Sequence, residues 1–383
     1  MDTALQHITE RVRQAAATAT PLRIRGGGSK DFYGQSLQGE VLDTRPLQGI
    51  VSYEPSELVI TVRAGTPLAE VEAVLAGKGQ YLPFEPPHFG SRREPPSPPL
   101  GGGVRAGGQQ DSGTAAGSVA TIGGMVASGL NGPARASVGA VRDYVLGLEL
   151  LNGKAELLTF GGQVMKNVAG YDVSRLMAGA MGTLGLITEV SLKVLPRAVA
   201  ESTLVFELDE ARALGQLNQW GALPLPVNAS CWHEGALMVR LRGAQAAVVA
   251  AQKSMGGTVM DEGQATLLWN ALREQTAPFF QLAEGESLMR LSVPDTAPPL
   301  GLGPTLIEWG GAQRWLKLPL PQRAGMSAVL DNTSGHATLF RAADKSAGVF
   351  TPLAAPLDRI TRELKKQFDP AGIFNRGRLY PDF

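Results

Sequence analysis

Three glycine-rich turns are the parts of this chain whose residue types are best suited to hold a ligand. The first is RGGGSK at 25–30, at the end of the short strand-like segment 22–25. Successive main-chain N–H groups in such a turn form an anion-binding nest, and glycine lets phosphate oxygens come within hydrogen-bonding distance. The spacing matches neither a Walker A loop nor the dinucleotide-binding Gly-x-Gly-x-x-Gly. Taken alone, the turn predicts either a phosphate site of another kind or a flexible turn without a ligand.

Two further turns place glycine where a backbone could approach a ligand closely. TIGGMVASG at 121–129 lies at the expected start of a helix, and GTLGLI at 182–187 leads into an apolar strand. A polar run, KNVAGYD at 166–172, precedes the latter turn. Three such turns, separated by strands, suit a long extended ligand that has a pyrophosphate and two ring systems.

Helices and strands must position these turns. Apolar residues at helical spacing predict an amphipathic opening helix over 4–17. Segments rich in β-branched residues predict strands at 22–25, 49–54 and 57–62. An apolar run predicts another strand at 186–195.

Local signals predict the ends of two further elements. Thr66 would cap the N-terminus of a helix that has Pro67 at its first position and ends in glycine. Asn152-Gly153, between two β-rich segments, predicts a hairpin with a type I′ turn. Near the C-terminus, PLDRITRELKKQF predicts a basic amphipathic helix whose charges form a solvated face.

Composition limits the class of protein. The 383 residues predict two domains, and 35 basic residues balance 35 acidic ones, which argues against a nucleic-acid partner. No apolar run is long enough for a membrane span, and the N-terminus lacks the apolar core of a secretory signal. Because Cys231 is the only cysteine, the chain holds neither a disulfide framework nor an iron–sulfur ligand set. We therefore expect a cytoplasmic protein, with peripheral attachment at the inner face of a membrane through partners left open.

The order of the three turns and their flanking segments resembles the FAD-binding domain of the vanillyl-alcohol-oxidase/PCMH flavoprotein superfamily. Four segments carry this resemblance: RGGGS at 25–29, VRAGTPLAEVEAVLAGKGQYLPFEPP at 62–87, TIGGMVASG at 121–129, and KNVAGYDVSRLMAGAMGTLGLITEVSLKVLP at 166–196.

Within that superfamily, the chain is similar to the family formed by the second FAD-binding component of bacterial three-component glycolate oxidases. The matching segments are EPPHFG at 85–90, GGQVMKNVAGYDVSRLMAG at 161–179, EWGGAQRW at 308–315, GHATLFR at 335–341 and FDPAGIFN at 368–375. The resemblance covers essentially the whole chain except 91–117. The usual Asn-Pro-Gly near the C-terminus is Asn375-Arg376-Gly377 here, and the Pro/Gly-rich insertion precedes the second turn, where relatives are shorter.

The resemblance implies an α+β fold in three parts. A PCMH-type FAD-binding domain of two α+β subdomains would span 1–198, with a flexible Pro/Gly-rich insertion at 91–117. A smaller α+β cap domain would span 199–352. A C-terminal helix and tail, 353–383, would return to pack on the FAD domain.

The same resemblance implies non-covalent FAD and a set of residues to hold it. The pyrophosphate would contact the first turn, the flavin and ribityl chain the second, and the adenosine end the third. The implied cofactor residues are Arg25, Gly26, Gly27, Gly28, Ser29, Lys30, Thr121, Gly123, Gly124, Ser128, Gly182, Thr183, Gly185, Ile187 and Asn375.

Oxidation of a 2-hydroxy acid, the activity that the resemblance implies, needs a cation for the carboxylate and a base for the hydroxyl proton. Arginine suits the first task and histidine the second. The candidates are His336 and Arg341 in GHATLFR and Arg314 in GGAQRW. Each has a structural alternative, namely a strand-end histidine bonded to its own backbone or a guanidinium packed on a neighbouring tryptophan.

No metal site is expected, although related catalytic flavin subunits carry a metal-binding histidine cluster. The chain's four histidines are His7, His88, His233 and His336. No two of them have the spacing of a metal pair. His88, after two prolines, is interpreted either as a flavin-side residue or as a structural turn histidine.

Three other positions have simple interpretations. Lys166 would reach the cofactor or lie in solvent, and Tyr171-Asp172 would form a turn and a helix cap. Cys231, beside a tryptophan, is expected to be a buried small hydrophobe.

The first functional interpretation is an FAD subunit that works beside a catalytic flavin subunit and an iron–sulfur subunit. Glycolate would be oxidised to glyoxylate, and electrons would leave through the iron–sulfur partner because this chain has no cysteine set of its own. Two alternatives stay open. The chain could be a non-catalytic, FAD-stabilised assembly subunit, or a free-standing FAD-dependent hydroxy-acid dehydrogenase.

Overall fold

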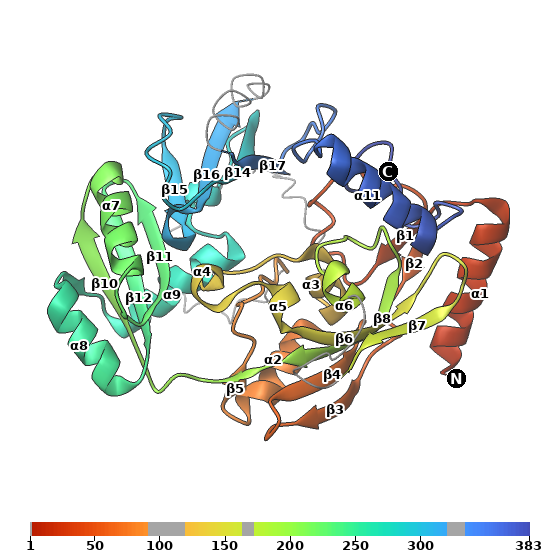
Figure 1. Cartoon of the computed structure of the whole chain (residues 1–383), viewed down its shortest axis with the longest axis horizontal. Helices are drawn as coiled ribbons and strands as arrows, with labels where there is room; N and C mark the ends of the chain where they lie inside the picture. The colour runs from red at the N-terminus through yellow and green to blue at the C-terminus, as the bar shows by residue number, and fades with distance from the viewer. Residues whose placement is uncertain (1, 91–118, 163–171, 320–333) are drawn as a thin grey trace, which may run out of the picture.

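The computed structural model describes residues 2–90, 119–162, 172–319 and 334–383. A five-stranded sheet and an eight-stranded sheet lie side by side, each with its own helices (Figure 1). This arrangement confirms the α+β fold class. The predicted insertion at 91–117, together with Lys166 and Tyr171, lies outside the described residues.

The N-terminal part of the chain builds the five-stranded sheet and a small parallel pair beside it. The five-stranded sheet has the order β3-β4-β8-β6-β7, and its neighbours pair antiparallel. Its strands are β3 (Ile50–Glu54), β4 (Val59–Arg63), β6 (Val145–Leu151), β7 (Leu157–Gly161) and β8 (Leu186–Lys193). The parallel pair is β1 (Leu22–Arg25) with β2 (Glu40–Asp43), and a second small pair is β5 (Gln80–Tyr81) with β9 (Leu195–Pro196).

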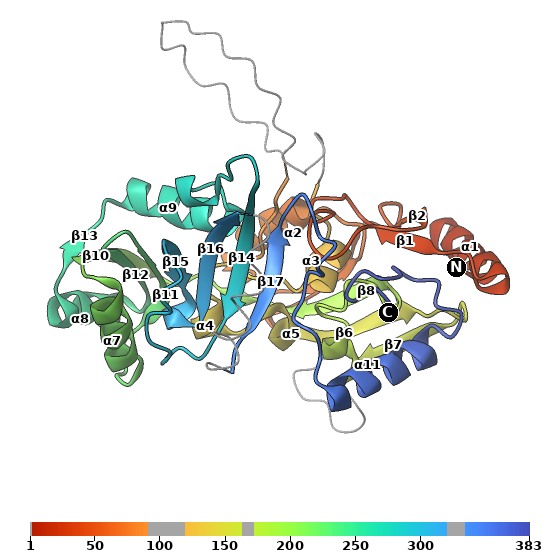
Figure 2. The same cartoon turned by 90° about the horizontal axis from the view of Figure 1, so that it is seen from above.

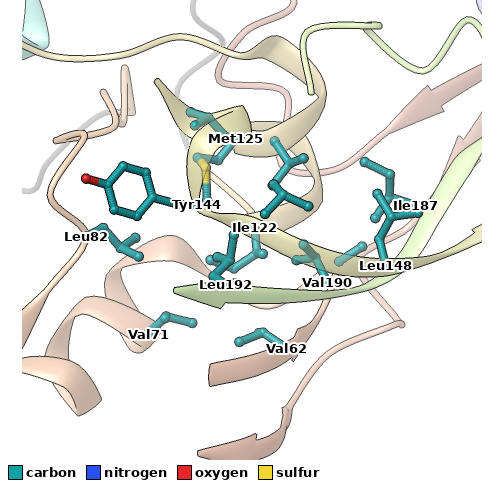
Figure 3. Packing of buried hydrophobic residues seen from close by; sticks show 14 of the residues in the cluster. Val62, Val71, Leu82, Ile122, Met125, Tyr144, Leu148, Ile187, Val190 and Leu192 are labelled. Atoms are coloured by element: carbon teal, nitrogen blue, oxygen red, sulfur yellow. The ribbon is translucent and has the colours of Figure 1, made fainter. Parts of the chain in front are cut away.

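Helices of this unit supply much of its apolar core. They are α1 (Thr3–Thr18), α2 (Leu68–Ala76), α3 (Ile122–Ser128), α4 (Arg135–Val138), α5 (Val141–Tyr144) and α6 (Val173–Leu176). Figure 3 shows part of the core, including Val71 of α2, Met125 of α3 and Val190 of β8, all fully buried. The burial of such side chains is the main favourable term in the stability of the unit.

Two local predictions are wrong in detail. Thr66 does not cap α2, because its hydroxyl accepts a hydrogen bond from the Gly49 amide instead. The β6–β7 hairpin forms, but its loop has five residues, since β6 ends at Leu151 and β7 begins at Leu157. The side-chain oxygen of Asn152 accepts two backbone N–H groups within this loop. The left-handed residue is Ala155 rather than Gly153.

The middle of the chain builds the eight-stranded sheet, whose order is β13-β10-β12-β11-β15-β16-β14-β17. Its strands are β10 (Ala200–Glu207), β11 (Val227–His233), β12 (Ala236–Gly243), β13 (Thr258–Val259), β14 (Glu286–Ser292), β15 (Thr305–Glu308), β16 (Gln313–Pro319) and β17 (His336–Arg341). All pairings are antiparallel. Two short 3₁₀ turns, Pro278–Phe280 and Trp309–Gly311, connect them.

Three helices cover the two faces of this sheet. They are α7 (Glu210–Gly221), α8 (Gln245–Met255) and α9 (Glu262–Glu274). Helices α7 and α8 share a core with Leu204 and Val239, whereas α9 packs with Cys231, Leu288 and residues of the first unit. Figure 2 shows α9 on the opposite side of the sheet from α7 and α8. The α9 side of the sheet therefore faces the first unit.

The C-terminal segment returns to the first unit. Helix α11 (Ala355–Phe368) ends against the β6–β7 hairpin, where the Phe368 carbonyl accepts from the Gly153 amide, and Phe374 forms a parallel bridge with Leu22 of β1. The prediction that the charges of α11 face solvent is only partly correct, because Lys365 is only 8% exposed. Its ammonium group donates to the carboxylate of Asp369 and to the carbonyls of Thr183 and Phe374.

The described helices include none that is both long and apolar enough to cross a bilayer.

Candidate cofactor site

The three glycine-rich turns meet around one cavity. It encloses about 770 Å³ of space, which includes open solvent at its mouth. All the predicted cofactor residues except Thr183 line it. Those residues are Arg25, Gly26, Gly27, Gly28, Ser29, Lys30, Thr121, Gly123, Gly124, Ser128, Gly182, Gly185, Ile187 and Asn375.

Thr183 has a different place from the one predicted. It is fully buried, and its hydroxyl donates to the Ala180 carbonyl at 2.7 Å. Its own carbonyl accepts from Lys365 at 2.6 Å. Thr183 therefore closes the third turn and anchors the C-terminal helix, and it does not line the cavity.

The first turn offers unused backbone donors. Among the described residues, the amides of 26–30 donate no hydrogen bond, whereas the carbonyls of Gly27 and Gly28 accept from Val119 and Asp31. Buried or half-buried N–H groups without partners are rare in folded proteins, so a run of five indicates a ligand that accepts hydrogen bonds. Such a run is the donor set of an anion nest.

Glycine is required in this turn because other backbone lies against it. A Cβ on Gly27 would come within 1.7 Å of the Val119 carbonyl oxygen, and one on Gly26 within 2.3 Å of the Thr121 hydroxyl. Gly28 has a φ of +79°, which L-residues with side chains rarely adopt. The first and second turns thus pack directly on each other.

The second turn differs from the first because its amides are already used. At the start of α3, the amides of Ile122 and Gly123 donate to Thr66 and Ala64, and the Gly124 amide donates to the Thr121 hydroxyl. A Cβ on Gly123 would lie 2.7 Å from the Cβ of Ala64. This turn therefore supplies a close-packed wall, while free phosphate donors come from the first turn.

The third turn is held by Asn375 from the C-terminal segment. The Asn375 side chain accepts from the Ile24 amide at 2.8 Å and donates to the Met181 carbonyl at 2.6 Å. A Cβ on Gly182, whose φ is +70°, would approach the Asn375 amide to 2.7 Å. Asn375 lines the cavity, and both ends of its side-chain amide bind the protein and fix the third turn against β1.

Three cations border the cavity, and one of them, Arg25, is paired with Asp31 at 2.7 Å. Burial lowers the pKa of Lys30 to about 8, and its ammonium group has only two long hydrogen bonds, to Ser29 at 3.2 Å and to the His88 carbonyl at 3.4 Å. Arg378 donates to the carbonyls of Lys30 and Asp31, and burial lowers its pKa to about 10. Both side chains stay charged enough at neutral pH to favour an anionic ligand.

Sequence reasoning missed Arg378. Its guanidinium holds carbonyls of the first turn, which leaves the amides of that turn for a ligand. Arg378 lies three positions after Asn375 in NRGRLY, but no spacing rule links it to residues about 350 positions earlier.

The predicted catalytic residues are not brought together. Arg314 is fully buried on the side of the eight-stranded sheet that faces away from the first unit, and it donates to the carbonyls of Gly311, Pro298 and Ala297. It lines neither this cavity nor a second, smaller one. No exposed donor is left for a substrate carboxylate, so we correct this prediction to a structural role.

Arg341 does face the first unit, and a β-bulge puts it there. In the β14–β17 pairing, Met289 lies opposite Leu339 and Leu288 opposite Arg341, so Phe340 is an extra residue. The bulge turns both Phe340 and Arg341 toward the first unit, as bulges beside functional sites often do. The Arg341 guanidinium lies 4.6 Å from the centroid of the Phe32 ring, and burial lowers its pKa to about 10.

His336 lies exposed at the start of β17, and like Arg341 it lines neither of the two cavities. Partial burial of the ring and the neighbouring guanidinium groups of Arg290 and Arg135 lower its pKa. A neutral imidazole can accept a proton, so its chemistry suits a base.

The remaining predictions have structural outcomes. His88 pairs with Glu72 of α2 at 2.9 Å and lines neither cavity, which favours the structural interpretation. Asp172 caps α6 by accepting from the Arg175 amide, and Cys231 is buried with a thiol pKa raised by that burial. Within the described ranges, no three His, Cys, Asp or Glu side chains gather as metal ligands would.

Residues 3–91 match the family described as FAD binding domain. The glycolate oxidase subunit GlcE of Escherichia coli is 45% identical over 378 residues, which cover 98% of this chain and 97% of that protein. The glycolate oxidase subunit GlcD of Bacillus subtilis is 27% identical over 198 residues, 51% of this chain and 36% of that protein. Among solved structures, alkyldihydroxyacetonephosphate synthase is similar in fold, with a TM-score of 0.63 at 14% identity, over 97% of this chain and 75% of that one.

Proposed function

This chain belongs to the family of the glycolate oxidase subunit GlcE, and on that premise we propose that it is the FAD-binding subunit of a complex that oxidises glycolate to glyoxylate. The observation that carries the proposal is the cavity where the three predicted turns meet, together with the five amides of the first turn that donate no hydrogen bond within the described residues. Those amides, beside Lys30, suit the pyrophosphate of FAD. The 45% identity over nearly the whole chain supports the same assignment.

The residues of the cavity would hold FAD without a covalent bond. Bound FAD would supply the acceptor for a hydride from the hydroxy acid. The first turn would bind the pyrophosphate through its amides, and the second would exclude water along a wall of closely packed backbone. The third turn, fixed by Asn375, would hold the opposite end of the cofactor.

On the side of the eight-stranded sheet, two of the predicted residues keep their proposed roles. Arg341 has aromatic rings around its guanidinium and no carboxylate partner among the described residues, so it is available to an anion. His336, with its lowered pKa, would accept the hydroxyl proton at neutral pH. Arg314 is left out because the backbone uses its donors.

The proposal includes partner subunits. The GlcE relative is by name one subunit of a glycolate oxidase, and the GlcD relative another. An iron–sulfur subunit would take the electrons, since this chain has one cysteine and a cluster typically needs four ligands. The alternatives are an assembly subunit without turnover and a free-standing dehydrogenase.

An anaerobic titration with glycolate distinguishes these roles. The purified chain should carry flavin and show its absorbance. Bleaching of that absorbance by glycolate without partners would rule out the purely structural role, and bleaching only after partners are added would rule out the free-standing one. A folded chain that takes up no FAD would contradict every version of the proposal.

A further inference from the structure

The loop that follows β17 in the second unit, the one built on the eight-stranded sheet, contacts the backbone just beyond the first glycine turn. Lys345 lies in this loop, and its ammonium group donates to the carbonyl of Gly34 at 2.8 Å and to the carbonyl of Phe32. Both acceptors belong to the stretch that leaves the first turn, residues 30–35, which we call the 30–35 segment. A side chain of the second unit thus holds the backbone that continues directly from the anion nest.

Arg378 holds the same segment from the C-terminal tail. Its guanidinium group donates to the carbonyls of Lys30, Asp31 and Gln35. Together with the lysine of the second unit, it binds five of the six carbonyls of the 30–35 segment. Hydrogen bonds from charged donors are stronger than neutral ones, so these two cations fix this stretch of backbone.

Side chains of the 30–35 segment also contact the second unit. The Phe32 ring centroid lies 4.6 Å from the guanidinium group of Arg341, and the Tyr33 ring lies 5.2 Å from the ring of Phe340. Both contacts come from β17, the strand at the edge of the eight-stranded sheet that leads into the loop with the lysine. The second unit therefore holds this segment through both its backbone and its side chains.

The conformation of the first turn depends on the same segment. The Gly28 carbonyl accepts from the Asp31 amide at 3.1 Å, and the Asp31 carboxylate pairs with Arg25 at 2.7 Å, so Asp31 closes the turn. A trans peptide unit points its N–H and its C=O in opposite directions. The Ser29 amide therefore points away from the bond that its peptide carbonyl makes, and it has no partner among the described residues. A shift of Asp31 would change the direction of this amide.

Lys345 acts on the turn indirectly, because it does not line the cofactor cavity. Burial and the nearby guanidinium group of Arg378 lower its pKa to about 8, so it is mostly charged at neutral pH. The acid next to it in the chain, Asp344, is exposed and accepts from the Ser346 amide at 2.8 Å. The two carbonyls of the first unit are thus the hydrogen-bond partners of a partly buried ammonium group.

We propose that Lys345 is a positioning residue for FAD, which fixes the 30–35 segment so that the amides of the first turn keep the conformation that binds the pyrophosphate. The second unit thereby contributes to cofactor affinity without touching the cofactor. This inference rests on the proposed pyrophosphate site in the first turn, and it does not depend on which substrate is oxidised.

The test compares FAD affinity among full-length variants, measured by flavin fluorescence during titration of the apoprotein. Lys345→Met keeps the aliphatic stem and removes the ammonium group, so FAD binding should weaken by about fivefold or more. Lys345→Arg keeps a charged donor and should restore most of the affinity. In the FAD-saturated protein, hydrogen exchange at the amides of 27–29 should be faster in Lys345→Met than in the parent, which reports on the turn itself.

Lys317→Met is the matched control, because Lys317 of β16 also donates to a carbonyl, that of Gln281 at 3.2 Å, but within the second unit. It should bind FAD like the parent. Equal FAD affinity in Lys345→Met and the parent would overturn the proposal, as would Lys345→Arg binding FAD as weakly as Lys345→Met. A Lys345→Met chain that does not fold without FAD, judged by urea unfolding of the apoproteins, would show a general structural role and overturn it too.

Failure of this inference is distinguishable from failure of the proposed function. If FAD affinity falls in Lys345→Met but glycolate never bleaches the flavin, with or without partners, the positioning role stands and the oxidase role fails. If glycolate bleaches the flavin and all variants bind FAD equally, the oxidase role stands and the positioning role fails. A parent chain that binds no FAD would overturn both.

Discussion

At the scale of single residues, three arginines show how surroundings decide a role. Arg314 is surrounded by carbonyl oxygens and holds a loop of the second sheet. Arg378 also binds carbonyls, but those carbonyls belong to the first glycine turn, so it orders a ligand site without being its main contact. Arg341 has aromatic rings around it and keeps its donors. The residue type is the same in each case, and the roles differ because the three side chains have different neighbours in the folded chain.

Gly27 allows a direct test of the cofactor site. Gly27→Ala would force a Cβ to within 1.7 Å of the Val119 carbonyl, so the first and second turns must separate. We expect at least a tenfold loss of FAD affinity, measured by flavin fluorescence during titration of the apoprotein. Gly215→Ala is the control, since Gly215 lies in α7 with open space around it, and this change should be neutral or stabilising by about 0.5–1 kcal/mol. Unchanged FAD affinity in Gly27→Ala would contradict the assignment.

Glu308 should make stability depend on pH. Its pKa is about 7 in the folded chain, above its ordinary 4.5, so the folded state holds the proton more tightly. This tighter proton binding stabilises the folded state fully below pH 4.5, and the stabilisation is lost as the pH rises through 7. Glu308→Gln should therefore gain up to roughly 3 kcal/mol over the parent at pH 8 and little at pH 5. Urea unfolding at both pH values measures the difference.

The comparison depends on the charges around Glu308. Burial and the nearby Glu85 disfavour its ionised form, while Arg273 and Arg290 line the second, smaller cavity together with it. Comparing parent and variant at each pH cancels the titration of groups that the substitution leaves alone. A pH-independent difference between the two proteins would show that Glu308 ionises normally.

At the scale of elements, periodicity predicted which segments form helices and strands, and contacts between segments decided the details. The loop after β6 illustrates this. Gly153 was expected in a two-residue turn, but its backbone lies against Asp369, and its amide donates to the Phe368 carbonyl. The bulge in β17 is another example, because alternation alone would turn Arg341 away from the first unit. Neither the contact of Gly153 with Asp369 nor the bulge in β17 produces a recognisable pattern in the local sequence.

Helix α11 offers a test at this scale. Lys365→Met would leave the buried Asp369 carboxylate unpaired and two carbonyls without a donor. Removing one partner of a buried pair typically costs about 3–5 kcal/mol. We expect that loss in the free energy of unfolding, measured by chemical denaturation. Lys366→Met, one position along and paired only with the exposed Glu363, should change it by less than about 1 kcal/mol.

At the scale of the whole molecule, a buried ion-pair cluster joins the two units. Glu85, which adopts a φ of +47°, accepts from Arg240 and Arg242 of β12 at 2.7–3.0 Å. Burial opposes ionisation of Glu85, but the two guanidinium groups hold its pKa below the ordinary value. Its carboxylate also accepts from the Ala134 amide, so one side chain connects two loops of the first unit with the second sheet.

Glu85→Gln should loosen this junction. Arg240, whose side chain is 3% exposed, would keep its charge without a carboxylate, at a cost of about 3–5 kcal/mol. Hydrogen exchange at the Ala134 amide should accelerate, which reports on the junction itself. In contrast, Glu201→Gln removes only the solvent-exposed partner of Arg242 and should leave that exchange rate unchanged. Equal exchange in both variants would argue against a joining role for Glu85.

The cofactor turns could be predicted from the sequence because a glycine often marks a position where the backbone conformation or a close contact excludes a side chain. Gly27, Gly28 and Gly182 stand where a side chain would collide or a left-handed φ is required, and such positions are visible in a single sequence. Arg378 could not be identified, because its importance lies in hydrogen bonds to carbonyls about 350 positions earlier in the chain. That property depends on the packing of segments distant in the chain.

The hydrogen bonds of Asn375 to β1 and to the third turn affect the order of events during protein synthesis. Ile24 and Asn375 are 351 positions apart, and the third turn is fixed only when the last residues arrive. At translation speeds of about 5–20 residues per second, the first glycine turn waits on the order of 20–70 s for its partner. A nascent chain that has not yet reached Asn375 thus lacks a finished cofactor cleft, and flavin uptake has to follow the synthesis of that residue.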